Sequence, residues 1–405
     1  MKRHNCDSAL PLEGLVVLDL TRLLPGPLCT MLMGDYGAEV IKIEDLEAGD
    51  PTRFVGRFLE GSGTFFRVLN RNKKSFAVNL KTEAGCKILK ELAGRADVLV
   101  EGFRPGVMDR LGLGYESLAE INPRLVYASI SGYGQEGPYR ERAGHDINYA
   151  ALSGLLDLSA AEGSAPRVPT AQVADIAGGS LMALNGIMMA LYKRQESGRG
   201  SFIDIPMTRG LLPWLTYAAS GYNDDGNLPG YGRGHITGGY ACYNIYETAD
   251  GRHMSLGALE PVFWQRFCEA AGRPQWAELQ FEDRNQKQLI SEVRALFKEK
   301  TRAQWEEFFS NLDACCEPVL NLEEAIGHPV SREGGYWLKT RHETGETELT
   351  PGFPLLFSGR EGERRLPPPR HGEHTGEILR DIGYTDNTIK SLAAKGVISQ
   401  AAGDC

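Results

Sequence analysis

GLVVLDLTRLLPGPLCTMLMGDYGAEVIKIE, residues 14–44, is the stretch that decides the fold class. Its first seven residues are almost all apolar, which is typical of a strand covered on both faces. Pro27 suits the first turn of a following helix, and Gly37 suits the end of that helix. EVIKIE, residues 39–44, predicts a second strand. Strand, helix and strand in this order predict a βαβ unit with parallel strands.

The same alternation continues on the carboxyl side of this unit. Apolar runs predict further strands, and amphipathic or Leu- and Met-rich runs predict helices between them. In chain order these elements are expected at 75–80, 82–93, 97–103, 115–121, 125–134, 176–195 and 201–207. The repeated alternation predicts an α/β fold with a parallel, doubly wound sheet and right-handed crossovers.

The character of the chain changes near residue 220. Residues 221–239 are Gly-rich and polar, which favours a linker or mobile loop. The segment after them predicts a hairpin that turns at Asp250-Gly251. Amphipathic helices are expected at 260–271, 285–299 and 302–311. Residues 240–330 are therefore predicted to form a smaller α+β domain.

The bulk composition narrows the classes of protein. The chain has 405 residues, 42% of them hydrophobic and 24% charged, as in ordinary globular proteins. The net charge of −9 argues against non-specific nucleic-acid binding. The most apolar helical stretch, residues 180–192, is short and contains Asn185, so no membrane span is expected. The N-terminal stretch MKRHNCDSALPLEG has no apolar core, so no secretory signal is expected.

Eight cysteines are scattered along the chain, at positions 6, 29, 86, 242, 268, 315, 316 and 405. No CxxC motif occurs among them, which argues against a zinc ribbon or a redox dithiol. Reduced thiols and a cytoplasmic location are expected. His371 and His374 could suggest a metal pair, but no third ligand accompanies them, so no metal is expected.

The first strand–helix turn is TRLLPGP, which lacks the glycine pattern of a dinucleotide site. The chain also lacks the phosphate-binding-loop and GxSxG patterns, so an NTPase and a serine hydrolase lose support. Basic residues gather near predicted strand ends, namely Arg22, Arg71, Lys74 and Arg104. They suit the phosphates of an anionic ligand, although such residues also simply solvate a surface.

Three residues near predicted helix starts could carry chemistry. Asp175 precedes the long helix, where it suits an N-cap, but Gly178 and Gly179 leave the first turn open to a ligand. Glu260 precedes another helix and equally suits its first turn. His145 follows a Gly/Pro-rich loop and either starts a helix or moves a proton.

Several ordered motifs together resemble one family. They are GLVVLDLTRLLPGPLCTMLMGDYGAEVIKIE, NRNKKSFAVNLK, EGFRPGVMDRLGLGYE, SISGYGQEGPY, VADIAGG and GEHTGEILRDIGY. Over nearly its whole length the chain resembles the class III CoA-transferase superfamily, and within it the alpha-methylacyl-CoA racemases most closely. The resemblance implies a large Rossmann-like domain built from residues 1–220 and, after a linker, from 331–405. It also implies an interlocked homodimer that binds CoA at the large domain, with the active site between domains.

The resemblance also assigns residues. The GHDINY motif matches the racemases, so His145 matches their acid/base histidine and Asp146 the neighbouring aspartate. Asp175 matches the aspartate that racemases and transferases share. Glu260 in GALEP matches the glutamate that supports the histidine, and Tyr243 matches a further active-site residue. The phosphates of CoA are expected to contact the four basic residues Arg22, Arg71, Lys74 and Arg104.

These matches predict an enzyme of lipid metabolism that needs no metal and no cofactor beyond the coenzyme A of its acyl-CoA substrate. It is expected to invert the α-carbon of 2-methyl-branched acyl-CoA thioesters through an enolate, with His145 and Asp175 on opposite faces. The alternative is an acyl-CoA:carboxylate CoA-transferase with Asp175 as nucleophile, and a third interpretation is a non-catalytic CoA-ester binding protein. The acyl chain and the roles of Cys315 and Cys316 stay open. No nucleic-acid or membrane partner is expected.

Overall fold

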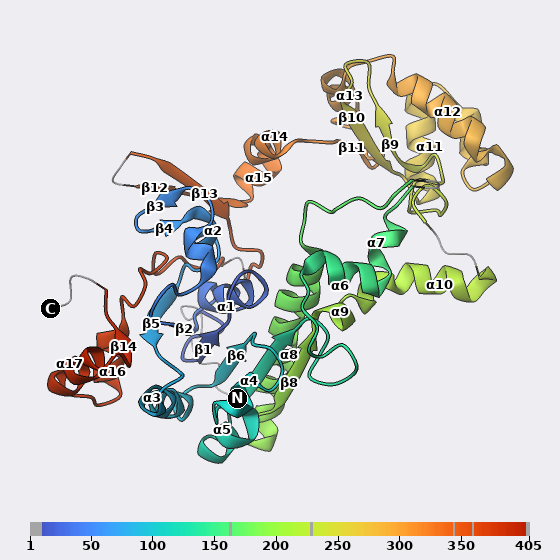
Figure 1. Ribbon diagram of the computed structural model, residues 1–405. Helices are drawn as coiled ribbons and strands as arrows, with labels where there is room; N and C mark the ends of the chain where they lie inside the picture. The colour runs from blue at the N-terminus through green and yellow to red at the C-terminus, as the bar shows by residue number, and fades with distance from the viewer. Residues whose placement is uncertain (1–9, 162–163, 227–229, 343–344, 359, 402–405) are drawn as a thin grey trace, which may run out of the picture. The chain divides into compact units, whose positions relative to one another are not determined.

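The structure is a computed structural model that describes residues 10–161, 164–226, 230–342, 345–358 and 360–401 (Figure 1). Within these residues the chain forms two compact units. The first unit takes the chain up to residue 153, from 169 to 212 and from 335 onward, and the second takes 154–168 and 213–334. These bounds differ from the predicted division at 221–239, because helix α10 (Thr216–Asp225) continues into that segment.

A seven-stranded sheet forms the centre of the first unit. In spatial order its strands are β14 (Ile398–Ser399), β5 (Lys73–Val78), β2 (Glu39–Glu44), β1 (Val16–Leu20), β6 (Val98–Glu101), β7 (Val126–Ser131) and β8 (Phe202–Pro206). The six longer strands pair in parallel, and β14 pairs antiparallel with β5. The predicted parallel α/β fold is therefore confirmed, and the short antiparallel edge strand was not predicted.

The strand order reverses at β1. From β1 the chain passes to β2 and β5 on one side, and it later builds β6, β7 and β8 on the other. The loops after β1 and β6 therefore diverge at the same edge of the sheet, which is where open α/β sheets bind ligands. The central strands are fully buried, since the register partners Val17 and Val98 have no exposed surface.

Helices link the strands of the first unit. They are α1 (Pro25–Asp35), α2 (Thr64–Arg67), α3 (Glu83–Ala93), α4 (Val107–Arg110), α5 (Tyr115–Ile121), α6 (Asp146–Ser153), α8 (Met182–Ser197) and α9 (Met207–Gly210). Pro25 suits the start of α1, because N–H groups in the first turn have no partner within the helix and proline has no N–H. The Thr82 side chain caps α3 by accepting the Gly85 N–H.

The carboxyl end of the chain returns to the same sheet. Helices α16 (Thr375–Asp381) and α17 (Asp386–Ala394) lie beside β5 and β14 (Figure 1). Ile378 and Ile398 share a hydrophobic core with Leu18. Two hairpins complete the first unit, β3 (Phe58–Leu59) with β4 (Ser62–Gly63) and β12 (Trp337–Arg341) with β13 (Thr347–Pro351).

One long helix of the first unit has an irregular start. Its first part, η2 (Ala174–Leu181), is π-helical and leads directly into α8. Gly178 lies there against the Met207 carbonyl oxygen, which would be 2.5 Å from any Cβ at this position. Glycine is therefore required for the close packing of η2 on α9. A π-turn is an irregularity found often at functional sites.

The same helix, Ala174–Ser197, is the one helix of the described residues that is long and apolar enough to cross a membrane. This finding differs from the sequence-based expectation, because the helix extends beyond the short apolar run on both sides. Half of its most apolar window is buried within the protein, where α8 packs on β7 and β8. Length and composition alone do not separate a core helix from a spanning one.

The second unit has a three-stranded antiparallel sheet in the order β11 (Cys316–Pro318), β10 (His253–Gly257) and β9 (Tyr243–Glu247). The hairpin predicted at Asp250-Gly251 joins β9 to β10. Besides α10, its helices are α7 (Leu155–Leu158), α11 (Pro261–Ala270), α12 (Gln286–Phe297), α13 (Arg302–Phe309), α14 (Leu322–Gly327) and α15 (Pro329–Glu333). An aromatic cluster that includes Trp264, Phe267 and Trp305 forms its core.

Six cysteines lie within the described residues, and each is a free thiol: Cys29, Cys86, Cys242, Cys268, Cys315 and Cys316. Cys6 and Cys405 lie outside the described residues, as does most of the N-terminal stretch in which no secretory signal is expected. The two histidines considered as a metal pair contact the backbone instead, since His371 Nε2 lies 2.7 Å from the Asp45 carbonyl oxygen and His374 Nδ1 accepts the Ser75 N–H.

Candidate active site

A cavity of about 330 Å³ opens in the first unit at the carboxyl edge of its sheet. The loops after β1, β6 and β7 line it, together with the start of α6 and residues from η2 and α9. The reversal of strand order between β1 and β6 produces this position, because the loops that leave the two strands turn away from each other. His145 and Asp175 both line this cavity, as do Arg22 and Arg104.

Asp175 stands in the first turn of the π-helical stretch η2. Its backbone N–H donates to Asp146 Oδ1 at 3.0 Å, which holds the two acidic residues together. Burial raises the pKa of Asp175 to about 6, and the Asp146 carboxylate acts in the same direction, while His145 acts against it. The carboxyl group therefore exchanges its proton near neutral pH.

His145 immediately precedes α6, and its backbone is fixed by that helix start. The His145 N–H donates to Asn148 Oδ1 at 3.0 Å, and the His145 carbonyl accepts the Asn148 N–H at 2.8 Å. These reciprocal bonds are those of a helix N-terminus. The backbone of His145 thus starts a helix while its exposed imidazole lines the cavity, so the two sequence-based interpretations are compatible.

Tyr149 is a cavity residue that the sequence interpretation did not single out. Its hydroxyl donates to the Gly144 carbonyl at 2.5 Å, just before His145. A Cβ on Gly132 or Gly144 would come within 2.6 Å of the Tyr149 ring, so the loop closes tightly over it. Burial raises the pKa of Tyr149 to about 12, and Asp175 contributes in the same direction, so the hydroxyl stays protonated. The sequence signal that could have identified Tyr149 was its position one helical turn after His145.

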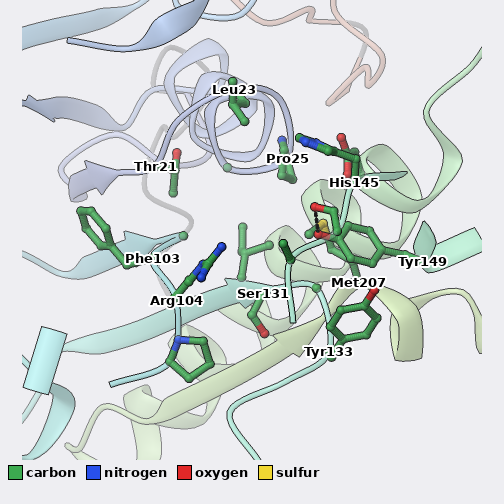
Figure 2. Close-up of a pocket in the computed structure, with 18 of the residues that line it drawn as sticks. Thr21, Leu23, Pro25, Phe103, Arg104, Ser131, Tyr133, His145, Tyr149 and Met207 are labelled. Atoms are coloured by element: carbon green, nitrogen blue, oxygen red, sulfur yellow. Dashed lines mark hydrogen bonds between the residues drawn. The ribbon is translucent and has the colours of Figure 1, made fainter. Parts of the chain in front are cut away.

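Arginines occupy the other end of the cavity. Figure 2 shows Arg104 and Phe103 on one side of the view, and His145 and Tyr149 on the other. The Arg22 guanidinium carbon lies 5.7 Å from the centroid of the Phe103 ring. Two further lining residues that were not predicted also carry guanidinium groups, Arg140 and Arg142. They belong to the loop after β7, which the sequence pattern did not mark as a strand end of interest.

A buried acid sets the course of the loop that carries Arg104. Glu101 ends β6, and its carboxylate accepts the Phe103 N–H at 2.7 Å and contacts the Ser129 hydroxyl. Burial raises the pKa of Glu101 to about 7. The Gln135 side-chain amide donates to Ser129 Oγ at 2.8 Å and extends the network to the loop after β7. This network therefore links two of the loops that line the cavity.

Arg71 and Lys74 do not line this cavity, and their contact with CoA phosphates stays a prediction. Arg71 is buried and forms two hydrogen bonds with Asp35, at 2.9 and 2.7 Å. Lys74 lies 2.8 Å from both Glu39 and Glu377, and these two carboxylates raise its pKa against the effect of burial. Both residues sit near the amino end of β5, opposite the edge where parallel strands bind ligands. Arg71 therefore has a clear structural role in the ion pair with Asp35.

Glu260 and Tyr243 belong to the second unit, and both lie near the turn that follows β10. Tyr243 and Gly257 are register partners in the β9–β10 ladder, and the Gly257 N–H donates to the Cys315 carbonyl at 2.8 Å. Glu260 follows that turn at the start of α11. Burial raises the pKa of Cys315, and Asp313 and Glu260 add to the effect. The structure thus gathers three segments of the second unit that the sequence interpretation named separately.

The cavity combines two kinds of chemistry. At one end, a carboxyl group with a pKa of about 6 stands with an imidazole. Carboxyl and imidazole groups are common general acids and bases. At the other end, guanidinium groups can bind phosphates in a bidentate way. The geometry therefore suits acid–base or nucleophilic chemistry on a substrate with an anionic handle.

Comparison with known proteins identifies the family of the chain. The family model described as CoA-transferase family III matches residues 12–375. The chain is 36% identical to a mouse succinyl-CoA:glutarate CoA-transferase (98% of this chain, 92% of that one) and 35% identical to the human alpha-methylacyl-CoA racemase (96% and 98%). A solved CAIB/BAIF family protein from Brucella suis has 28% identity and a TM-score of 0.79 (92% and 100% covered). These matches confirm the resemblance found in the sequence motifs, and the chain belongs to CoA-transferase family III.

Proposed function

We propose that this enzyme of CoA-transferase family III is an acyl-CoA racemase or epimerase. It inverts the α-carbon of 2-methyl-branched acyl-CoA thioesters by proton transfer through an enolate. His145 and Asp175 are the two acid/base groups, and arginines at the far end of the cavity, including Arg22 and Arg104, bind the phosphates of CoA. One observation carries the proposal: an imidazole and a carboxyl group with a pKa of about 6 line the same cavity.

The proposed reaction requires two groups that can each bind and release a proton. The thioester carbonyl acidifies the α-proton, because the carbanion is delocalised into an enolate. Inversion needs a base on one face of the carbon and an acid on the other, and the two groups exchange roles in the reverse direction. Both groups must therefore be able to hold or release a proton at the same pH. A buried Asp175 fits this role better than an ordinary aspartate, which is almost fully ionised at neutral pH.

The enolate oxygen needs hydrogen-bond donors. The amides at the start of η2 are already engaged, since the Asp175 N–H donates to Asp146 and the Ile176 N–H donates to the Gln172 carbonyl. In the first turn of α6 the Asn148 N–H is engaged as well, since it donates to the His145 carbonyl at 2.8 Å, which leaves the N–H groups of Asp146 and Ile147 as the candidate donors. One such donor contributes about 3–4 kcal/mol to transition states in other enzymes.

Residues of the second unit and a second chain complete the proposed site. By the family match, Glu260 is the carboxylate proposed to support the acid/base histidine, as in a catalytic triad. Tyr243 is proposed as a further active-site residue. Two chains form an interlocked homodimer, and the enzyme works in the cytoplasm without a metal or a separate cofactor.

A CoA-transferase with Asp175 as nucleophile is the second candidate. It draws support from the relatives, because the mouse succinyl-CoA:glutarate CoA-transferase is as similar to this chain as the human racemase. An attacking carboxylate must be ionised, and the burial that raises the pKa of Asp175 opposes ionisation. A transferase also has no need of an imidazole at the position of His145.

Isotope exchange separates the two candidates. A racemase incorporates deuterium from D₂O at the α-carbon of a chiral 2-methylacyl-CoA with no acceptor acid present. His145→Ala abolishes that exchange, while Ile147→Ala, which alters the next turn without removing a base, retains it. Transfer of CoA to a free carboxylate, together with hydroxylamine trapping at Asp175, contradicts the racemase proposal.

A further inference from the structure

The turn after β1 carries Arg22 to the cavity in a strained conformation. Leu23 has a positive φ of 67°, a region that side chains crowd and that is left mainly to glycine. Leu23 is 43% exposed, so tight packing of its side chain does not explain the conformation. The contacts of the backbone from Thr21 to Leu23 must therefore hold the turn.

Asp19 holds the first residue of the turn. Its carboxylate accepts the Thr21 N–H at 3.0 Å and the Thr30 hydroxyl at 2.7 Å. Lys73 Nζ lies 2.9 Å from Asp19 Oδ2, and both side chains are fully buried. Burial alone raises the pKa of Asp19, but Lys73 and Lys42 hold it well below its usual range. Asp19 therefore remains an anion inside the protein.

Lys42 and Asp50 hold the other side of the turn. Lys42 Nζ donates to the Thr21 carbonyl at 3.0 Å and lies 3.0 Å from Asp50 Oδ2. Asp50 Oδ1 accepts the Leu23 N–H at 3.3 Å. Both charged side chains are fully buried. The backbone on each side of Arg22 is thus bonded to buried charges, while the Arg22 side chain itself is exposed and lines the cavity.

Asp50 also stabilises the fold, because its Oδ1 accepts the Thr52 N–H at 3.0 Å at the start of the short helix η1 (Pro51–Phe54). The buried Lys42–Asp50 pair needs a further explanation. Burying an ion pair costs desolvation energy that commonly offsets the attraction, so apolar side chains often stabilise a core as well. Here the polar atoms of Lys42 and Asp50 meet at the backbone of a single turn. Both side chains are therefore placed to control the conformation of this turn. Arg22 lies between Thr21 and Leu23, the two residues whose backbone groups they bind.

We propose that Lys42 and Asp50 are positioning residues that hold Arg22 in the orientation that binds the anionic part of the CoA thioester. The assignment rests on the proposed function, in which Arg22 contacts a CoA phosphate. A guanidinium on a fixed turn loses less conformational freedom on binding than one on a mobile loop. The contribution of Arg22 to affinity therefore depends on Asp50.

A double-mutant cycle tests this dependence. CoA itself is the probe, and its binding to the full-length protein is measured by calorimetry, so that no turnover is needed. Asp50→Ala is expected to weaken binding about tenfold, the scale of one charge-assisted hydrogen bond. Arg22→Ala is expected to weaken it similarly, and the double variant should bind little worse than either single variant.

Glu348→Ala is the matched control. It removes an equally buried carboxylate, which lies 2.8 Å from Arg67 and does not line the cavity. It should lower thermal stability as Asp50→Ala does and leave CoA affinity unchanged. If Asp50→Ala does not fold, Asp50→Asn replaces it, because Asn keeps the shape and one acceptor oxygen. A threefold weakening, roughly, is then expected, again without further loss when Arg22→Ala is added.

The outcomes separate this inference from the proposed function. Wild-type protein that does not bind CoA overturns the proposed function and the positioning role together. Wild-type binding with strictly additive losses in the cycle overturns the positioning role alone. The same holds if the Asp50 variants bind CoA like the wild type, or if Glu348→Ala weakens binding as much as they do.

Discussion

The two edges of the first unit's sheet use arginine in opposite ways. At the carboxyl edge, Arg104 follows β6, is exposed and lines the cavity. Near the amino edge, Arg71 precedes β5 and is buried with Asp35. In the sequence, Arg104 follows a predicted strand and Arg71 precedes one, so Arg104 is the better placed of the two for a ligand. The direction of the strands decides which arginine is available to a ligand and which one supports the fold.

The largest expected effect lies at the carboxyl edge. Asp175→Asn removes one of the two proton carriers while keeping the shape of the side chain. Racemisation is expected to fall by about 10²–10⁴-fold, the usual worth of one positioned acid or base. Loss of optical activity of a chiral 2-methylacyl-CoA measures the rate. An Asp175→Asn enzyme that retains wild-type turnover contradicts a catalytic role for the carboxyl edge of the sheet.

The matching change near the amino edge should affect stability. Arg71→Leu removes the ion-pair partner of buried Asp35 and leaves that carboxylate with the hydrogen bond from the Asn72 side-chain amide, which is expected to cost about 3–5 kcal/mol of unfolding free energy. Urea denaturation followed by circular dichroism measures the loss, and turnover per folded molecule should not change. A selective rise in KM for acyl-CoA in this variant would show that Arg71 contributes to substrate binding. The two edges of the sheet would then not differ in the way described.

A smaller effect is expected from Arg104→Ala. The KM for an acyl-CoA thioester should rise about tenfold, because one charge-assisted contact with a phosphate is lost. The matching thioester of pantetheine, which lacks the nucleotide, should react with the variant and with the wild type at equal rates. Equal loss with both substrates indicates a role for Arg104 at the reacting end of the cavity instead.

The smallest expected effect is a shift of the pH profile in Asp146→Asn. In the proposed racemase one of the two acid/base groups is protonated and the other is not, so kcat/KM should give a bell-shaped pH profile. A negative Asp146 raises the pKa of Asp175, so Asp146→Asn lowers that pKa. The acid limb of the profile should move to lower pH by up to about one unit. A limb that stays in place shows that Asp146 acts only through its bond to the Asp175 N–H.

The site was only partly predictable because its residues have local roles as well. His145 begins α6 with ordinary N-terminal bonds, so its local pattern alone does not reveal an imidazole in a cavity. The family motif added that information. Arg140 and Arg142 sit in an irregular loop, where no periodicity marks the side chains that face a ligand. The close packing of Gly178 against the Met207 carbonyl also could not be predicted, because it joins segments about 30 residues apart.

The sequence by itself determined the alternation of strand and helix, because hydrophobic periodicity and turn residues are local properties of the chain. It also determined the family, through ordered motifs that survive without any coordinates. Only the tertiary structure decided which polar residues face the ligand. Burial and partner charges are non-local: they moved the pKa of Asp175 to about 6 and paired Arg71 with Asp35, 36 positions earlier in the chain. They also fixed the turn at Arg22 with Lys42 and Asp50, which lie on later segments of the chain.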